Sequence, residues 1–184
     1  MYEFHYKYMM PTFSGSKVIF TDTDSLCYII PDVPNVHEKI KGSERFDFSN
    51  FPQDHPNYRE KYKMTPGKFK DECPYSTVVE VVGHRSKRYS ILKIDGENMK
   101  AANGVCSNVK KNVITHEDYK ESLMENVVMG HMQCRIGPTS HTLMTIDKYK
   151  KSLCPYNDKR WIEKNGTEFE TYSFGHWRLK GELF

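Results

Sequence analysis

Residues 17–30 read KVIFTDTDSLCYII, and this stretch decides the fold that the sequence predicts. Two short runs of β-branched and aromatic side chains, Lys17–Phe20 and Leu26–Ile30, flank a polar acidic centre. Runs of this composition are typical of β-strands. The stretch therefore predicts either a β-hairpin or one strand followed by its exit loop. Because continuous apolar strands are usually buried, we expect them to deliver the acidic centre to a cleft.

Asp22 and Asp24 are the two carboxylates of this centre. Side chains at positions i and i+2 of an extended strand point the same way, so both carboxylates are expected on one face, where they repel each other. A divalent cation relieves that repulsion, and Mg²⁺ binds proteins through one or two carboxylates together with substrate phosphates. The pattern suits two-metal phosphoryl transfer. The alternative is an acidic turn that is simply exposed to solvent.

Outside this stretch the sequence predicts an α+β fold with antiparallel strands. Tyr2–Met10 predicts an aromatic-rich helix that ends at Pro11, and residues 42–66 predict a long polar connection that carries aromatic side chains. Thr115 is expected to cap a helix that runs to about Val128. A small meander is predicted at Gly67–Glu72, Thr77–Val82, Lys87–Ile94 and Glu97–Ala102. A later strand is predicted at Ser140–Tyr149. A final hairpin is predicted from Trp161-Ile162 and Thr167–Tyr172, with a turn at Asn165-Gly166.

Composition excludes several classes of protein. The 184 residues are 38% hydrophobic and 13% aromatic, and the aromatic content argues against a disordered chain. No apolar run approaches the roughly 20 residues that span a membrane, and the charged first ten residues do not resemble a signal peptide. The five cysteines are spread out and form no C-x-x-C pair, which argues against a disulfide framework or a structural zinc site. We therefore expect an intracellular protein with reduced thiols.

Charge is divided unevenly along the chain. Residues 1–84 hold 10 basic and 12 acidic side chains, whereas residues 85–184 hold 17 and 12. A basic second half beside an acidic first half points to a polyanionic partner.

Several motifs along the chain resemble, in their identity and their order, the C-terminal part of protein-primed family B DNA polymerases of Maverick/Polinton transposons and related viruses. The acidic centre TDTDS resembles the third palm motif of these enzymes. The motifs cover nearly the whole chain and are Lys17–Ile30, Phe46–Pro56 (FDFSNFPQDHP), Gly67–Glu72 (GKFKDE), Val82–Ser90 (VGHRSKRYS), Ile114–Tyr119 (ITHEDY) and Asp158–Trp161 (DKRW). The resemblance implies a DNA-directed DNA polymerase that acts in DNA replication, with Mg²⁺ as cofactor.

The resemblance also implies roles for single residues. Asp24 matches the carboxylate that binds both catalytic metals, and Asp22 matches its auxiliary partner. Lys87 and Tyr89 match the Lys-x-Tyr motif that holds the primer–template near the active site, the lysine through a phosphate and the tyrosine through its ring and hydroxyl. The alternative for this segment is a solvated strand face.

Other basic residues are expected to add contacts with the DNA backbone. Arg85 and Arg88 flank the Lys-x-Tyr motif. Lys100 lies where the family carries Lys-x-Lys-Gly, but this chain reads KAANG, so the second lysine is absent. A thumb-like groove is expected to be lined by Lys110, Lys111, Lys148, Lys150 and Lys151, which are otherwise solvated.

The resemblance implies that this chain is a fragment. Residues 1–104 would form the second part of a palm and residues 105–184 a thumb-like region. The family's exonuclease domain, its other metal-binding aspartate and its nucleotide-binding lysine would all precede Met1. We therefore expect an incomplete two-metal site, no polymerase activity from this chain alone, and an exposed apolar face. Expected partners are primer–template DNA, dNTP, the missing N-terminal polymerase segment and a terminal priming protein, in the nucleus or at a viral replication site.

Two other functions remain open on the sequence. One is a non-catalytic, DNA-binding remnant, for which the basic second half and the Lys-x-Tyr motif suffice. The other is an Asp-x-Asp phosphohydrolase, in which Asp22 would be the nucleophile. That class needs a parallel doubly wound sheet and a later Gly-Asp motif, and this sequence contains no Gly-Asp dipeptide.

Overall fold

The chain combines short helices with small sheets. The computed structural model describes residues 1–74, 76–156, 160–165, 168–173 and 176–177. Three of its sheets are two-stranded antiparallel pairs, and one two-stranded sheet is parallel. This mixture agrees with the expected α+β class. Within the described ranges, no helix has both the length and the apolar character needed to cross a bilayer.

The chain divides into two compact units. Unit 1 comprises Met1–Val81 and Ile91–Met99, and unit 2 comprises Val82–Ser90 and Lys100–Phe184. The expected division after residue 104 separates a palm segment from a thumb-like segment, and that assignment stays a prediction.

Unit 1 begins with a helical segment in three parts. These are α1 (Tyr2–Phe4), the π-helix η1 (His5–Met9) and α2 (Met10–Thr12). The segment ends at Thr12, just beyond the expected end at Pro11, because this proline lies in the first turn of α2, where a missing N–H is tolerated. Its exposed side carries Tyr2, Tyr6 and Met10.

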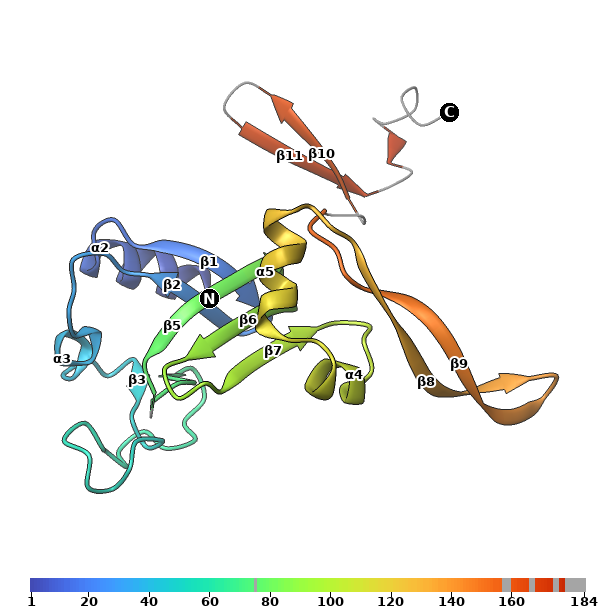
Figure 1. Ribbon diagram of the computed structural model, residues 1–184. Helices are drawn as coiled ribbons and strands as arrows, with labels where there is room; N and C mark the ends of the chain where they lie inside the picture. The colour runs from blue at the N-terminus through green and yellow to red at the C-terminus, as the bar shows by residue number, and fades with distance from the viewer. Residues whose placement is uncertain (75, 157–159, 166–167, 174–175, 178–184) are drawn as a thin grey trace. The chain divides into compact units, whose positions relative to one another are not determined.

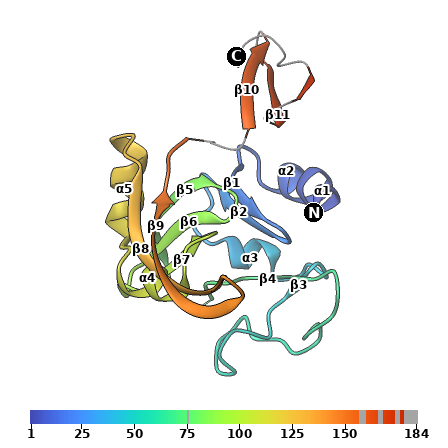
Figure 2. The same ribbon diagram turned by 90° about the vertical axis from the view of Figure 1, so that its right-hand side faces the viewer.

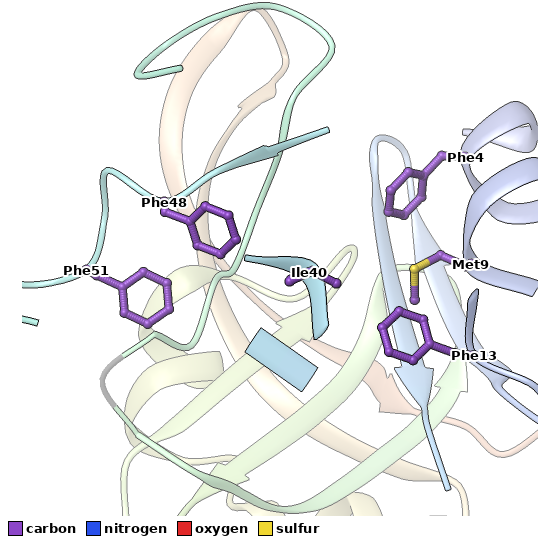
Figure 3. Close-up of a cluster of buried hydrophobic side chains, with 6 residues drawn as sticks. All are labelled: Phe4, Met9, Phe13, Ile40, Phe48 and Phe51. Carbon is purple, nitrogen blue, oxygen red and sulfur yellow. The ribbon is translucent and has the colours of Figure 1, made fainter. Parts of the chain in front are cut away.

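The core of unit 1 joins this segment to distant parts of the chain. Figure 3 shows Phe4, Met9 and Phe13 on one side of Ile40 and Phe48 and Phe51 on the other. Ile40 ends α3 (Val36–Ile40). The predicted long connection is therefore irregular but held by its aromatic side chains.

The four strands of unit 1 that precede the meander differ from the prediction in one respect. The hairpin strands β1 (Lys17–Asp22) and β2 (Ser25–Ile29) pair antiparallel. The strand expected at Gly67–Glu72 is only β4 (Phe69–Lys70), and it pairs in parallel with β3 (Phe46–Asp47) instead of joining the meander.

The meander itself is confirmed. It consists of β5 (Val78–Arg85), β6 (Arg88–Lys93) and β7 (Asn98–Ala102), in the order β5-β6-β7. The Asp95-Gly96 turn works because Gly96 adopts φ 84°, a left-handed conformation that glycine reaches without steric cost.

Two α-helices occur in the described part of unit 2, and the sequence predicted one of them. The capping box of Thr115 and Asp118 begins α5 (His116–Met124) as expected. This helix ends before Val128 because Asn126 adopts φ 56° and the Val127 N–H turns back to the Ser122 carbonyl. The unpredicted helix is α4 (Ser107–Asn112). The core of unit 2 is formed by Val82, Ala102, Val109, Ile114, Tyr119 and Leu153.

A long antiparallel hairpin follows α5. Its strands are β8 (Met129–Thr139) and β9 (Thr142–Leu153), which run side by side as a curved ribbon in Figures 1 and 2. The strand expected at Ser140–Tyr149 is thus wrong at its start, because Ser140 and His141 form the turn with φ 49° and 65°. The final hairpin, β10 (Arg160–Asn165) with β11 (Glu168–Ser173), is confirmed. Gly166 of its expected turn and Thr167, the expected start of its second strand, lie outside the described residues.

Candidate functional site

The acidic centre is the turn of the β1–β2 hairpin. Asp22 ends β1 and pairs with Ser25, so Thr23 and Asp24 form a two-residue turn. Of the two interpretations of this stretch, the hairpin is confirmed. The same-face argument does not hold for Asp24, because this residue lies in the turn and not on an extended strand. Asp22 is half-buried and Asp24 is exposed.

The backbone conformation of this turn is energetically unfavourable for Thr23. Thr23 adopts φ 56°, which is unusual for a β-branched residue and is disfavoured for residues other than glycine by about 1–2 kcal/mol. The Thr23 hydroxyl donates to the Asp22 Oδ1 over 3.3 Å, and the Ser25 hydroxyl donates to the Asp22 carbonyl over 3.1 Å. The two flanking hydroxyls thus bind both the side chain and the backbone of Asp22.

The strands that carry the turn are anchored on the core of unit 1. Leu26 and Tyr28 pack against the buried cluster, and Phe20 is itself buried. The Tyr28 hydroxyl lies 2.9 Å from the His5 Nδ1, which ties β2 to η1. The acidic turn is therefore carried by strands that pack on this core, while its expected place in a cleft stays a prediction.

Cys27 pairs with Phe20 across the hairpin. Burial raises the pKa of its thiol to about 11, with smaller contributions from Cys73 and Glu72. A thiol with this pKa is protonated at neutral pH and is a poor nucleophile. Covalent chemistry at Cys27 is therefore not favoured.

A second polar pair in unit 1 was not predicted from the sequence. The His37 Nε2 lies 2.8 Å from the Asp71 Oδ2, and both side chains are about one third exposed. Burial works to raise the pKa of Asp71, but the hydrogen bonds from His37 and from the Cys73 N–H outweigh it and hold this pKa below its usual value. The two residues are 34 positions apart, so no local pattern reveals the pair.

The acidic turn fits a divalent cation only in part. Asp22 and Asp24 provide carboxylate oxygens, the ligands that Mg²⁺ prefers, and such an ion takes its other ligands from water and phosphate. Among the described residues, no group of three or more His, Cys, Asp or Glu side chains gathers around a possible metal position. The two carboxylates therefore suit one magnesium ion shared with a phosphate, whereas a pair of ions needs further ligands.

The Lys-x-Tyr segment forms the turn between β5 and β6. Lys87 lies in that turn, exposed and with φ 60°, while Arg85 ends β5 and Tyr89 follows on β6, both half-buried. Lys87 is thus an exposed residue of the turn. This segment belongs to unit 2 and the acidic turn to unit 1.

Two other predicted DNA-binding residues are engaged within unit 2. Arg88 is only 5% exposed, and its charge acts on the neighbouring His84 and Tyr119. The Lys100 ammonium donates to the carbonyls of Ile114 at 2.6 Å and Lys111 at 3.3 Å, near the end of α4. Burial also lowers the pKa of Lys100. Both residues are poor candidates for a direct contact with DNA phosphate.

The β1–β2 pairing does not favour the phosphohydrolase interpretation. That class places its nucleophilic aspartate at the end of a strand in a parallel sheet, whereas β1 pairs antiparallel with the strand that follows it. In the described part of the chain, the parallel pair β3–β4 is two residues long on each side.

No protein-family model, curated protein or solved structure matches this chain. What the acidic turn does must therefore be inferred from its own residues, their geometry and the resemblance of the motifs.

Proposed function

We propose that this chain carries the catalytic hairpin of a DNA-directed DNA polymerase, an enzyme that transfers nucleotides to a primer with two magnesium ions. The observation that carries the proposal is the β1–β2 turn. It presents Asp22 and Asp24 at the end of two strands whose apolar side chains are anchored in a core. The order of the motifs along the chain, read as a resemblance to family B enzymes, supports the same function.

In this proposal the two carboxylates have different tasks. Asp24, exposed in the turn, contributes to both metal sites, and Asp22 supports it from the end of β1. The Thr23 and Ser25 hydroxyls orient Asp22 through its Oδ1 and its carbonyl. When bound, the metal ions activate the primer hydroxyl and neutralise the triphosphate.

The primer–template is assigned to the β5–β6 turn. Lys87, an exposed residue of this turn, is assigned to a backbone phosphate, and the half-buried Tyr89 follows it on β6. Arg85 is half-buried and adds positive charge beside them. Arg88 and Lys100 take no direct part, because the first is buried and the second already binds backbone carbonyls.

Metal binding at the acidic turn is the direct test of this proposal. Paramagnetic Mn²⁺, added to isotope-labelled chain in the presence of a dNTP, should selectively broaden the amide resonances of Thr23 and Ser25. Asp24→Asn should abolish this broadening. Asp32→Asn is the matched control, because Asp32 is also exposed with a positive φ but lies outside the hairpin turn. Broadening that is centred elsewhere, or that survives in Asp24→Asn, contradicts the proposal.

Polymerase activity gives a second test. The resemblance assigns a further metal-binding aspartate to a motif that these 184 residues do not match. We therefore expect the purified chain to leave a primer–template unextended with Mg²⁺ and dNTPs. Clear extension that Asp24→Asn abolishes would show that the chain is sufficient by itself.

A DNA-binding module without catalysis is the second candidate. It is favoured by the exposed Lys87 and by basic side chains on one face of the β8–β9 hairpin, Arg135 and Lys148 among them. This candidate predicts binding to duplex DNA that weakens steeply with salt and does not depend on metal ions. Metal-independent binding together with no Mn²⁺ effect at Thr23 would select it over the polymerase.

A further inference from the structure

The two faces of the β8–β9 hairpin have opposite character. Residues paired across an antiparallel hairpin share a face, and successive residues alternate between faces. The pairs Met132–Tyr149, Cys134–Asp147, Ile136–Thr145 and Pro138–Leu143 therefore lie on one face. We call its apolar members, Met132, Ile136, Pro138, Leu143 and Tyr149, the apolar hairpin face.

These apolar side chains are strongly exposed. The exposed fractions are 58% for Met132, 77% for Ile136, 74% for Leu143 and 67% for Tyr149. Together they expose on the order of 500 Å² of continuous apolar surface, about as much as the largest patch on a typical monomer, which is often functional. An isolated two-stranded hairpin is also only marginally stable in water. A second surface packed on this face would remove the apolar area from water and stabilise the hairpin.

Gly130, at the base of the hairpin, leaves room for an aromatic ring on the apolar hairpin face. A Cβ atom added to Gly130 would lie 2.6 Å from the Cε1, Cζ and hydroxyl oxygen of Tyr149. The Tyr149 ring therefore lies across the backbone of β8 at the one position where no side chain stands in its way. Its broad side adds to the apolar hairpin face.

The opposite face is basic and partly packed within unit 2. Here His131 pairs with Lys150, Gln133 with Lys148 and Arg135 with Ile146. Gln133 is buried, and its Oε1 accepts from the Cys106 N–H at 3.0 Å. The base of this face is thus already covered by its own unit, in contrast to the apolar face.

We propose that the apolar hairpin face is a self-association surface, on which a second copy of this chain docks face to face. Two copies packed in this way would bury on the order of 1,000 Å² in total, the lower limit for a specific interface. The charge on this face favours an identical partner, because Asp147 and Lys151 contribute one charge of each sign. Two copies can therefore meet there without net repulsion, which the basic face would not permit. The inference is independent of the polymerase proposal.

Consecutive residues of β9 provide a matched pair of test variants. Leu143 lies on the apolar hairpin face and Met144 on the basic face, and both side chains are exposed. In sedimentation of the full chain at tens of micromolar, we expect a monomer–dimer equilibrium with a dimer of twice 21.6 kDa. Leu143→Glu should weaken the dimer at least about tenfold, and Met144→Glu should leave it unchanged. A chain that stays monomeric, or a dimer that responds equally to both variants, overturns the proposal.

Cys134 provides a second, independent readout on the same face. It is exposed and pairs with Asp147. A thiol-specific crosslinker should give a covalent dimer that disappears in Cys134→Ser and persists in Cys73→Ser, since Cys73 is not part of the β8–β9 hairpin. Dimers that persist in Cys134→Ser would place the contact elsewhere and overturn the proposal.

Discussion

The β1–β2 and β8–β9 hairpins share a design but differ in what covers their side chains. Both are antiparallel and both turn on two residues with at least one positive φ. The side chains of Leu26 and Tyr28 on the short hairpin pack on the core of unit 1. On the long hairpin, the side chains of Ile136 and Leu143 lie in solvent.

This difference shows that strand pairing alone does not determine how firmly a residue is held. A short hairpin that is packed on a core can position two carboxylates, because its strands cannot shift without disturbing buried side chains. A long hairpin with exposed apolar residues gains little from its own packing and is better suited to receive another surface. Three predictions test this contrast, from the largest expected effect to the smallest, and two more concern the pH dependence of the units that carry the hairpins.

Truncation of a side chain on each hairpin should give very different losses of stability. Phe20→Ala removes a buried ring from β1 and should cost about 3 kcal/mol. Ile136→Ala removes an exposed side chain from β8 and should change stability by no more than about 0.5 kcal/mol. Urea unfolding followed by circular dichroism measures both, at a concentration where the chain is monomeric. Equal losses of stability in the two variants would contradict the proposed difference between the hairpins.

The base of the long hairpin should be more sensitive than its tip. Ser152 is fully buried, its hydroxyl donates to the Met129 carbonyl at 3.0 Å, and it lies 2.6 Å from the His131 Nδ1. Ser152→Ala removes both interactions and should cost about 1–2 kcal/mol. Thr145→Ala near the tip is the control and should have no measurable effect. Hydrogen exchange of β8 and β9 amides should show faster exchange at the base in the first variant alone.

The two hairpin turns should respond differently to glycine. Thr23→Gly relieves an unfavourable φ of 56° and should stabilise the fold by up to about 1 kcal/mol. His141→Gly should have a smaller effect, because histidine tolerates a positive φ better than a β-branched residue. Thermal unfolding of both variants compares them. A loss of stability in Thr23→Gly would show that its side-chain contacts outweigh the strain.

Acid should weaken unit 2 at His84. Burial lowers the pKa of His84, whose Nε2 lies 2.8 Å from the Tyr119 carbonyl in unit 2, and the nearby Arg88 and Arg85 lower it further. The folded state therefore binds fewer protons there than the unfolded state, so this contribution to stability is present above about pH 6.5 and is lost as the pH falls below that value. The measurement is the urea concentration at the unfolding midpoint, plotted against pH. On the acid side of this plot (its acid limb), the midpoint should fall less steeply in His84→Gln than in the unchanged protein.

Part of the alkaline limb should come from Cys27 in unit 1. Burial raises the pKa of the Cys27 thiol to about 11. The folded state keeps this proton after the unfolded state has lost it, so the contribution is present below about pH 9 and is lost as the pH rises through 11. Cys27→Ser should flatten this limb and leave the acid limb unchanged. A change in the acid limb instead would contradict the assignment.

Local sequence predicted the elements whose formation depends on near neighbours. The capping box of Thr115 and Asp118 begins α5 as expected, and the apolar runs on both sides of the acidic centre form a hairpin. Elements that depend on distant partners were missed or shortened. The strand β8 contains Gly130, Gly137 and Pro138, which weaken a strand pattern, and it forms because β9 pairs with it along its whole length.

The sequence predicted which residues belong to the candidate site, but not how buried or hydrogen-bonded each of them is. Asp22 and Asp24 share one hairpin, as the pattern indicated, and Lys87 lies exposed in a turn. The pattern could not show that Arg88 is buried or that the Lys100 ammonium binds the Ile114 carbonyl, because burial and hydrogen bonding depend on residues that are distant in the sequence.

The sequence by itself therefore determined the positions of the acidic turn, the capped helix and the meander, since periodicity and turn chemistry act over a few residues. The tertiary structure decided which charges are available and which apolar side chains are covered. It buried Phe20 and left Leu143 exposed, although both lie in strands with similar local patterns. The physical reason is that solvent exposure and electrostatic environment are sums over all neighbours in space, and most of those neighbours come from elsewhere in the chain.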